Sequence, residues 1–127
     1  MDFLNKYASQ ILGLTRIVTG LCFLEHGTSK LLGFPVPASG HTVALMSFPG
    51  GASGAIELVA GALIVLGLFS RTAAFIASGE MAVAYFMAHF PRGVFPILNG
   101  GDGAVLYCFI FLVLAAMGPG AFAINKK

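Results

Sequence analysis

The chain contains no tryptophan and very few charged residues, and the shortage of charge is the more informative of the two. Asp, Glu, Lys and Arg make up 9% of its 127 residues, whereas hydrophobic residues make up 57%. A typical soluble domain is about 25% charged. A chain this apolar lacks the polar surface that would cover it in water. The composition therefore excludes an ordinary soluble protein and favours a protein embedded in a membrane.

Cysteines and basic runs are also scarce. The formal net charge is only +2 and no basic run occurs, so nucleic acid is not an expected partner. The two cysteines, Cys22 and Cys108, lie in apolar segments and lack the spacing of a metal site. Their similar predicted depth leaves a redox-active pair as the less favoured alternative, because buried thiols in apolar surroundings are usually inert. No metal, haem or iron–sulfur cluster is expected.

Four apolar segments alternate with short breaks rich in proline and glycine. The predicted membrane spans cover about residues 8–32, 52–69, 73–90 and 102–117, each near the length of about 20 residues that a bilayer requires. We expect one domain over the whole chain: an all-α membrane protein, a four-helix transmembrane bundle of up-down topology. A short interfacial helix is predicted over 41–48 in the first outer loop.

The first apolar segment is expected to be retained rather than removed as a secretory signal, because it carries Arg16 and lacks a convincing cleavage site. With four spans, both termini and the turn at Arg71 share one side of the membrane. That side holds four basic residues, whereas the opposite side holds Lys30 and Arg92. Positive charge favours the cytoplasm, so we expect a multi-pass inner-membrane protein with both termini cytoplasmic.

Three charges fall deep inside the predicted spans. Arg16 and Glu80 each lie about 12 Å from the inner edge of their helices, at about 1.5 Å per residue. Their equal depth predicts a structural ion pair between Arg16 and Glu80, with Glu57 as the competing partner. A charge at membrane depth costs about 2.5–3.5 kcal/mol on insertion scales, so such residues usually pair or line a cavity.

The other polar side chains gather toward the predicted outer ends of the segments, and this asymmetry predicts a pocket open to the outer face. The histidines are candidate proton carriers because imidazole titrates near neutral pH, the structural alternative being histidines hydrogen-bonded at helix ends. The candidate ligand-binding residues are His26, Lys30, Glu57, Tyr85, His89, Asn99 and Asp102.

Groups of spaced residues run through nearly the whole chain: Arg16-x3-Gly20, His26-Gly27-x2-Lys30, Glu57-x3-Gly61, Gly67-Leu68-x2-Arg71, Gly79-Glu80-Met81-Ala82-x2-Tyr85-Phe86-x2-His89 and Asn99-Gly100-Gly101-Asp102. This combination resembles the DoxX family of small bacterial membrane proteins. The family is similar to the membrane subunits of quinone-linked thiosulfate oxidation, and its members are tied to respiratory and oxidative-stress functions. The resemblance implies a membrane component of a quinone-linked oxidoreductase.

In this interpretation the bundle holds a quinone headgroup near His26, His89 and Asp102 while a redox partner protein supplies electrons, because the chain has no intrinsic cofactor. Two alternatives stay open: a small-molecule or lipid-binding transport protein, and a non-catalytic membrane scaffold for a partner protein. Besides membrane lipids, a second copy of the chain is a candidate partner, because stripes of small residues pack helices equally well within one bundle or between copies.

Overall fold

The computed structural model describes residues 1–127, and every regular element in it is a helix. The α-helices are α1 (Asp2–Asn5), α2 (Ala8–Leu32), α3 (Gly50–Leu66), α4 (Ser70–Ala84), α5 (Pro96–Asn99) and α6 (Asp102–Met117). Helix α4 continues directly into a π-helix, η1 (Tyr85–His89), and a 3₁₀-helix, η2 (Phe90–Arg92). The all-α prediction is confirmed, and each predicted apolar segment corresponds to one long helix.

Glycines in the left-handed conformation end two of the long helices. Helix α2 stops at Gly33 (φ 69°), and the prolines that follow cannot continue it. Helix α3 stops at Gly67 (φ 69°), which lets the chain reverse within a few residues into α4. Helix α6 likewise stops before Gly118 and Pro119. Because such signals are local in the sequence, the predicted bounds 8–32 and 102–117 match α2 and α6.

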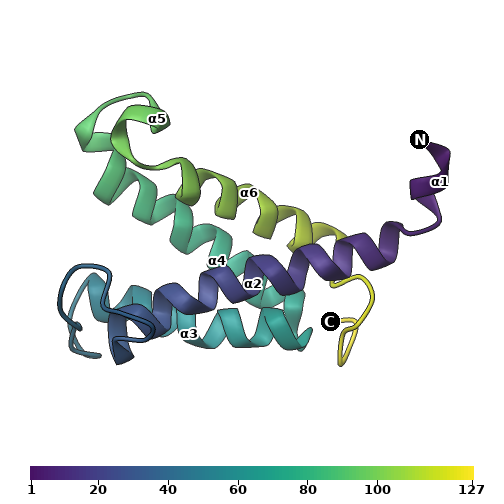
Figure 1. The fold of residues 1–127 in the computed structure, drawn as a ribbon, viewed down its shortest axis with the longest axis horizontal. Helices are drawn as coiled ribbons and strands as arrows, with labels where there is room; N and C mark the ends of the chain where they lie inside the picture. Colours follow the sequence, from purple (N-terminus) through teal and green to yellow (C-terminus); the bar gives the residue numbers. More distant parts are fainter.

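The long helices form two antiparallel pairs, α2 with α3 and α4 with α6 (Figure 1). The pairs cross and then diverge toward the end that carries α5 and the segment between α2 and α3 (Figure 1). Successive long helices run in alternate directions, and both termini lie at the opposite end of the molecule (Figure 1).

Glycines bring α2 and α3 into close contact. A Cβ atom added at Gly27 would lie 2.6 Å from the backbone nitrogen of Leu58, and one added at Gly61 would lie 2.9 Å from the Cα of Leu24. Small residues at such positions let two helix backbones approach closely. The glycine stripes of these helices therefore pack the two helices within one chain.

The buried core is small and the outer surface is apolar. Phe23, Ile64 and Phe111 are fully buried in one core cluster, whereas Phe75 and Phe109 are more than half exposed. Many other large apolar side chains are exposed on all four long helices. Such extensive exposed apolar surface is not found on ordinary soluble monomers.

Helix length and composition identify fewer membrane-spanning helices than the four that the sequence predicts. The stretch Ser70–Arg92 is the one helix whose length and composition suffice to cross a membrane. Helices α3 and α6 are apolar but have 17 and 16 residues. The transmembrane placement of the other three long helices therefore stays a prediction.

The interfacial helix predicted over 41–48 is wrong. The segment between α2 and α3 contains turns and bends but no helix. Its polar groups bond to the end of α2 and within local turns. Ser29 Oγ of α2 donates to the carbonyl of Val36 (2.7 Å), and the backbone nitrogen of Val43 donates to the carbonyl of Lys30 (2.8 Å). The backbone nitrogen of Ser47 donates to the carbonyl of Ala44 (3.0 Å), which closes a turn and not a helix. Backbone groups used in this way are not available for helical i→i+4 hydrogen bonds.

Arg16 is fully buried and binds the C-terminal segment. Its Nη1 donates to the carbonyls of Pro119 (2.6 Å) and Ala121 (3.0 Å), and its Nη2 donates to that of Phe122 (2.8 Å). Arg16 thus fixes the chain that follows α6 against α2.

The predicted ion pair between Arg16 and Glu80 is therefore wrong, and Glu57 does not replace Glu80 as the partner. The one ion pair of the structure joins Lys30 to Glu57. The guanidinium of Arg16 instead lies near the C-terminal ends of α3 and α6, where the helix dipoles are negative. Carbonyl oxygens and helix ends supply the negative potential for which the sequence suggested a carboxylate.

Candidate functional site

A cavity of about 690 Å³ occupies the space where the two helix pairs diverge. Helices α2, α3, α4 and α6, the π-helix η1 and the residues just before α3 all contribute to its lining. Apolar groups such as Phe23, Ile56 and Met81 form much of its wall. Its ionisable and hydroxyl-bearing lining residues are His26, Lys30, Ser53, Glu57, Glu80, His89 and Tyr107.

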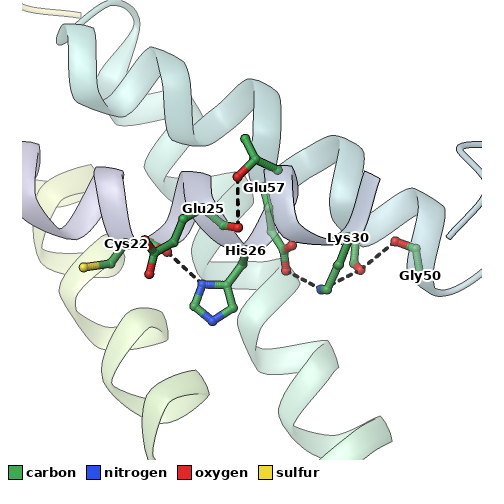
Figure 2. A network of polar contacts seen from close by, with 8 residues as sticks. Cys22, Glu25, His26, Lys30, Gly50 and Glu57 are labelled. Carbon is green, nitrogen blue, oxygen red and sulfur yellow. Dashed lines mark hydrogen bonds and ion pairs between the residues drawn. The ribbon is translucent and has the colours of Figure 1, made fainter. Parts of the chain in front are cut away.

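The charged centre of the cavity joins α2 to α3 (Figure 2). Lys30 Nζ lies 2.7 Å from Glu57 Oε1 and donates also to Ser53 Oγ (3.0 Å), which in turn donates to the carbonyl of Gly50 (3.1 Å). The Glu57 side chain is 1% exposed and that of Lys30 is 34% exposed. The ammonium thus compensates a buried carboxylate and remains accessible from the cavity side.

Two carboxylate oxygens in the cavity lining have no partner within the protein. Glu57 Oε2 and Glu80 Oε2 are both buried and accept no hydrogen bond. A buried polar atom without a partner costs free energy, so each such atom in a folded protein requires an explanation. Glu57 and Glu80 therefore bring unused hydrogen-bond acceptor capacity to the cavity wall.

In each of the two histidines, Nδ1 is hydrogen-bonded to a backbone carbonyl and Nε2 has no partner in the protein. His26 Nδ1 lies 2.7 Å from the carbonyl of Cys22 (Figure 2), and His89 Nδ1 lies 3.2 Å from the carbonyl of Asn99. A carbonyl only accepts, so Nδ1 carries the hydrogen in each case and Nε2 is the free acceptor of the neutral ring. Each histidine can therefore take up a proton at Nε2.

Tyr85 and Asn99 support this wall of the cavity but do not line it. Asn99 is 1% exposed, and its Nδ2 donates to the Tyr85 hydroxyl (3.2 Å) and the Gly93 carbonyl (2.9 Å). The Tyr85 ring stacks on His89 at 6.3 Å between centroids. Both residues therefore hold the η1 turn and orient His89.

Of the predicted pocket residues, the structure brings His26, Lys30, Glu57 and His89 together around one cavity. Asp102 is exposed in the first turn of α6 and lies outside the lining. A carboxylate there interacts favourably with the positive end of the helix dipole.

Glu80, Ser53 and Tyr107 line the cavity although sequence analysis did not place them there. Ser53 precedes Glu57 by four residues, so helical spacing indicates a shared face of α3. Because Glu80 was predicted to form an ion pair with Arg16, it was not among the predicted ligand-binding residues.

The cysteines lie outside this cavity and are both free. Cys22 is exposed on α2, and Cys108 on α6 is half-buried next to Ser78, whose hydroxyl donates to the Cys108 carbonyl (2.7 Å). No group of three or more His, Cys, Asp or Glu side chains is positioned to hold a metal ion. The polar chemistry of the cavity thus comes from carboxylates, imidazoles, hydroxyls and one ammonium.

Comparison with known proteins identifies the family. The DoxX family model matches residues 11–90, which include the α2, α3 and α4 contributions to the cavity. A protein of Haemophilus influenzae, described as an uncharacterized protein, is 44% identical over 130 residues that span 100% of this chain and 97% of the relative. No solved structure matches the chain. The chain belongs to the DoxX family.

Proposed function

We propose that this DoxX protein crosses the bacterial inner membrane four times, through α2, α3, α4 with η1 and η2, and α6. The apolar outer surface and the alternating helix directions support this topology. Helix α3, with 17 residues, is about 25 Å long, a few ångströms short of a hydrocarbon core of about 30 Å. Local thinning of the bilayer accommodates a mismatch of that size at modest cost.

The basic residues orient the bundle in this proposal. Lys6, Lys126 and Lys127 are close to the chain termini in sequence, and the backbone nitrogen of Arg71 donates to the carbonyl of Lys127 (3.1 Å), so four basic residues lie at the end that carries the termini. The other end has two basic residues, Arg92 in η2 and Lys30, which is engaged with Glu57. Positive charge in short loops favours the cytoplasmic side, so both termini are cytoplasmic and the cavity lies in the outer half of the membrane.

The cavity binds the ring of an isoprenoid quinone, and the observation that carries this proposal is the pair of unpartnered carboxylate oxygens in a largely apolar space. Lys30 offsets one of the two carboxylates, Glu57 and Glu80, so an anionic headgroup would meet excess negative charge. A flat, neutral ring with two polar atoms suits the cavity better. A ring site of this kind combines an apolar wall with a few placed polar groups.

The polar groups match the reduced form of such a ligand. A quinol carries two hydroxyl donors, whereas Glu57 Oε2, Glu80 Oε2 and each neutral histidine Nε2 are acceptors. Oxidation of the quinol releases two electrons and two protons, and quinone reduction takes up the same number. In this proposal a membrane-associated redox partner protein exchanges the electrons, while the histidines and carboxylates of the cavity exchange the protons.

Binding of a tail-less hydroquinone to the purified protein in lipid nanodiscs tests the proposal. Glu80→Met removes an acceptor that has no partner in the protein, so it should weaken binding by about tenfold or more, the value of one hydrogen bond to a charged group. Glu25→Met is the matched control, because Glu25 is exposed on α2 and does not line the cavity. Unchanged binding in Glu80→Met, or no binding by the wild type, refutes the proposal.

A second experiment addresses the redox role. In membrane vesicles that contain the partner, His26→Ala and His89→Ala should lower quinone reduction while the amount of folded protein stays constant. Full activity in both variants contradicts proton exchange through the histidines.

Transport of a cationic amphiphile is the alternative function, and one observation favours it: Glu80 forms no ion pair, and its Oε2 has no hydrogen-bond partner. A carboxylate in an apolar cavity binds an organic cation in exchange for a proton. Flux of a lipophilic cation into proteoliposomes without any redox change would support this alternative over quinone binding.

A further inference from the structure

A second cavity of about 340 Å³ lies between α3 and α4. Eight of its nine lining residues are hydrophobic, among them Val59, Leu63 and Phe69. Val59 is 61% exposed and Phe69 is 48% exposed, so this apolar groove opens on the outer surface of the helix pair. We call it the α3–α4 groove.

The α3–α4 groove adjoins the polar cavity. Ile56 and Ile76 line both spaces, so this one pair of side chains lies between them. Glu57 follows Ile56 directly, and Glu80 lies one helical turn beyond Ile76. The unpartnered carboxylates therefore lie beside the junction, with polar groups on one side of it and a purely apolar surface on the other.

The groove runs along the helices away from the polar cavity. On α3 it extends from Ala55 to Leu63, about 12 Å along the axis. On α4 it extends from Ile76 back to Thr72, next to the turn that contains Phe69. A flexible hydrocarbon chain that starts at the junction can thus lie lengthwise between the two helices, toward the end of the molecule that carries the termini.

We propose that the α3–α4 groove holds the isoprenoid chain of the ligand whose ring occupies the polar cavity. This inference rests on the proposed function and specifies its ligand class: a ring with an apolar chain attached directly to it. A ring seated beside Glu57 and Glu80 must pass its chain to an apolar surface, and the groove begins at Ile56 and Ile76.

The groove mainly determines the path of the isoprenoid chain and contributes little to the affinity of the ligand. Lipid acyl chains are as apolar as the groove, so moving the isoprenoid chain from lipid into the groove gains little hydrophobic free energy. The gain comes from van der Waals contacts and from a chain path that matches the position of the ring. Blocking the groove therefore penalises long-chain ligands by steric exclusion and leaves ring binding intact.

The test compares two ligands and two variants in nanodiscs. The ligands are the tail-less hydroquinone of the first test and the same ring with a decyl chain. Val59→Trp fills the groove from an exposed position, so it need not disturb the core. Val18→Trp is the matched control, because Val18 is 59% exposed on α2 and lines neither cavity. Taking the ratio of variant to wild-type affinity for each ligand cancels partitioning into the bilayer.

Val59→Trp should weaken binding of the decyl hydroquinone by about tenfold relative to wild type and should leave binding of the tail-less hydroquinone unchanged. Val18→Trp should bind both ligands as the wild type does. Equal affinity of Val59→Trp and Val18→Trp for the decyl hydroquinone overturns the groove assignment, while binding of the tail-less ring still supports the proposed function. If the wild type binds neither hydroquinone, both the proposed function and the groove assignment fail.

Discussion

Replacing Lys30 by methionine removes the positive charge that faces the buried Glu57 carboxylate. The two groups are 2.7 Å apart, and the Glu57 side chain is only 1% exposed. In Lys30→Met the Glu57 carboxylate stays buried and has lost its countercharge. Breaking a buried ion pair from one side in this way costs about 3–5 kcal/mol.

Replacing the other residue of the ion pair, in Glu57→Gln, should destabilise the protein much less than Lys30→Met does. In Glu57→Gln the ammonium of Lys30 keeps its hydrogen bond to Ser53 and reaches solvent or lipid headgroups, because its side chain is 34% exposed. The loss is then that of one charged hydrogen bond, about 1.5–3 kcal/mol. At roughly 4 °C per kcal/mol for a chain of this size, Tm should fall by about 15 °C in Lys30→Met and by about 8 °C in Glu57→Gln.

The chain itself supplies the probe for this measurement. It has no tryptophan, but Cys108 is half-buried and becomes reactive when the bundle unfolds. A fluorogenic maleimide therefore follows thermal unfolding in detergent, in a Cys22→Ser background that removes the exposed thiol.

The double variant Lys30→Met/Glu57→Gln shows whether the two residues stabilise the protein as a coupled pair or independently of each other. We expect its Tm to lie near that of Glu57→Gln alone, because no buried charge is left without a partner. If Lys30→Met is as mild as Glu57→Gln, or if the two losses add in the double variant, the ion pair is not the buried, coupled pair that the geometry implies.

Three further predictions concern other parts of the fold. Gly27→Ala should destabilise the protein by about 1–3 kcal/mol because its Cβ would lie 2.6 Å from the Leu58 backbone, whereas Gly79→Ala has open space within 4 Å and should be neutral or stabilising; equal Tm values for both would contradict this packing. Arg16→Met should increase hydrogen exchange in residues 118–125, since three carbonyls lose their donor, and unchanged exchange would refute the anchoring role. Asn99→Ala should lower Tm by about 8–15 °C, since three hydrogen bonds of a 1%-exposed side chain are lost; a shift below a few degrees would argue against it.

The helix bounds were largely predictable because their signals are local. Gly33 and the prolines after it end α2, and Gly118 with Pro119 ends α6, so backbone preference alone marks these positions. The π-helix η1 had no such signal. It widens the helix turn at His89, and nothing in the residue spacing distinguishes it from continued α-helix.

The partner of Arg16 was not predictable from depth. Equal depth along two helices leaves their rotation open, and the C-terminal segment that supplies the carbonyls lies more than 100 residues away in sequence. The gathering of His26, Lys30 and His89 near one cavity was predictable, because all three are polar residues toward the same end of their helices. That Glu80 lines the cavity without an ion-pair partner was not predictable, because Arg16 was expected to pair with it and binds the C-terminal carbonyls instead.

An experimental structure of the protein purified with its native lipids would show what occupies the cavity. We expect density for a planar ring between α2 and α4, in contact with Glu57 and Glu80, with a chain that leaves past Ile56. A cavity filled by a phospholipid headgroup, or closed by direct packing of the helix pairs against each other, would contradict this expectation.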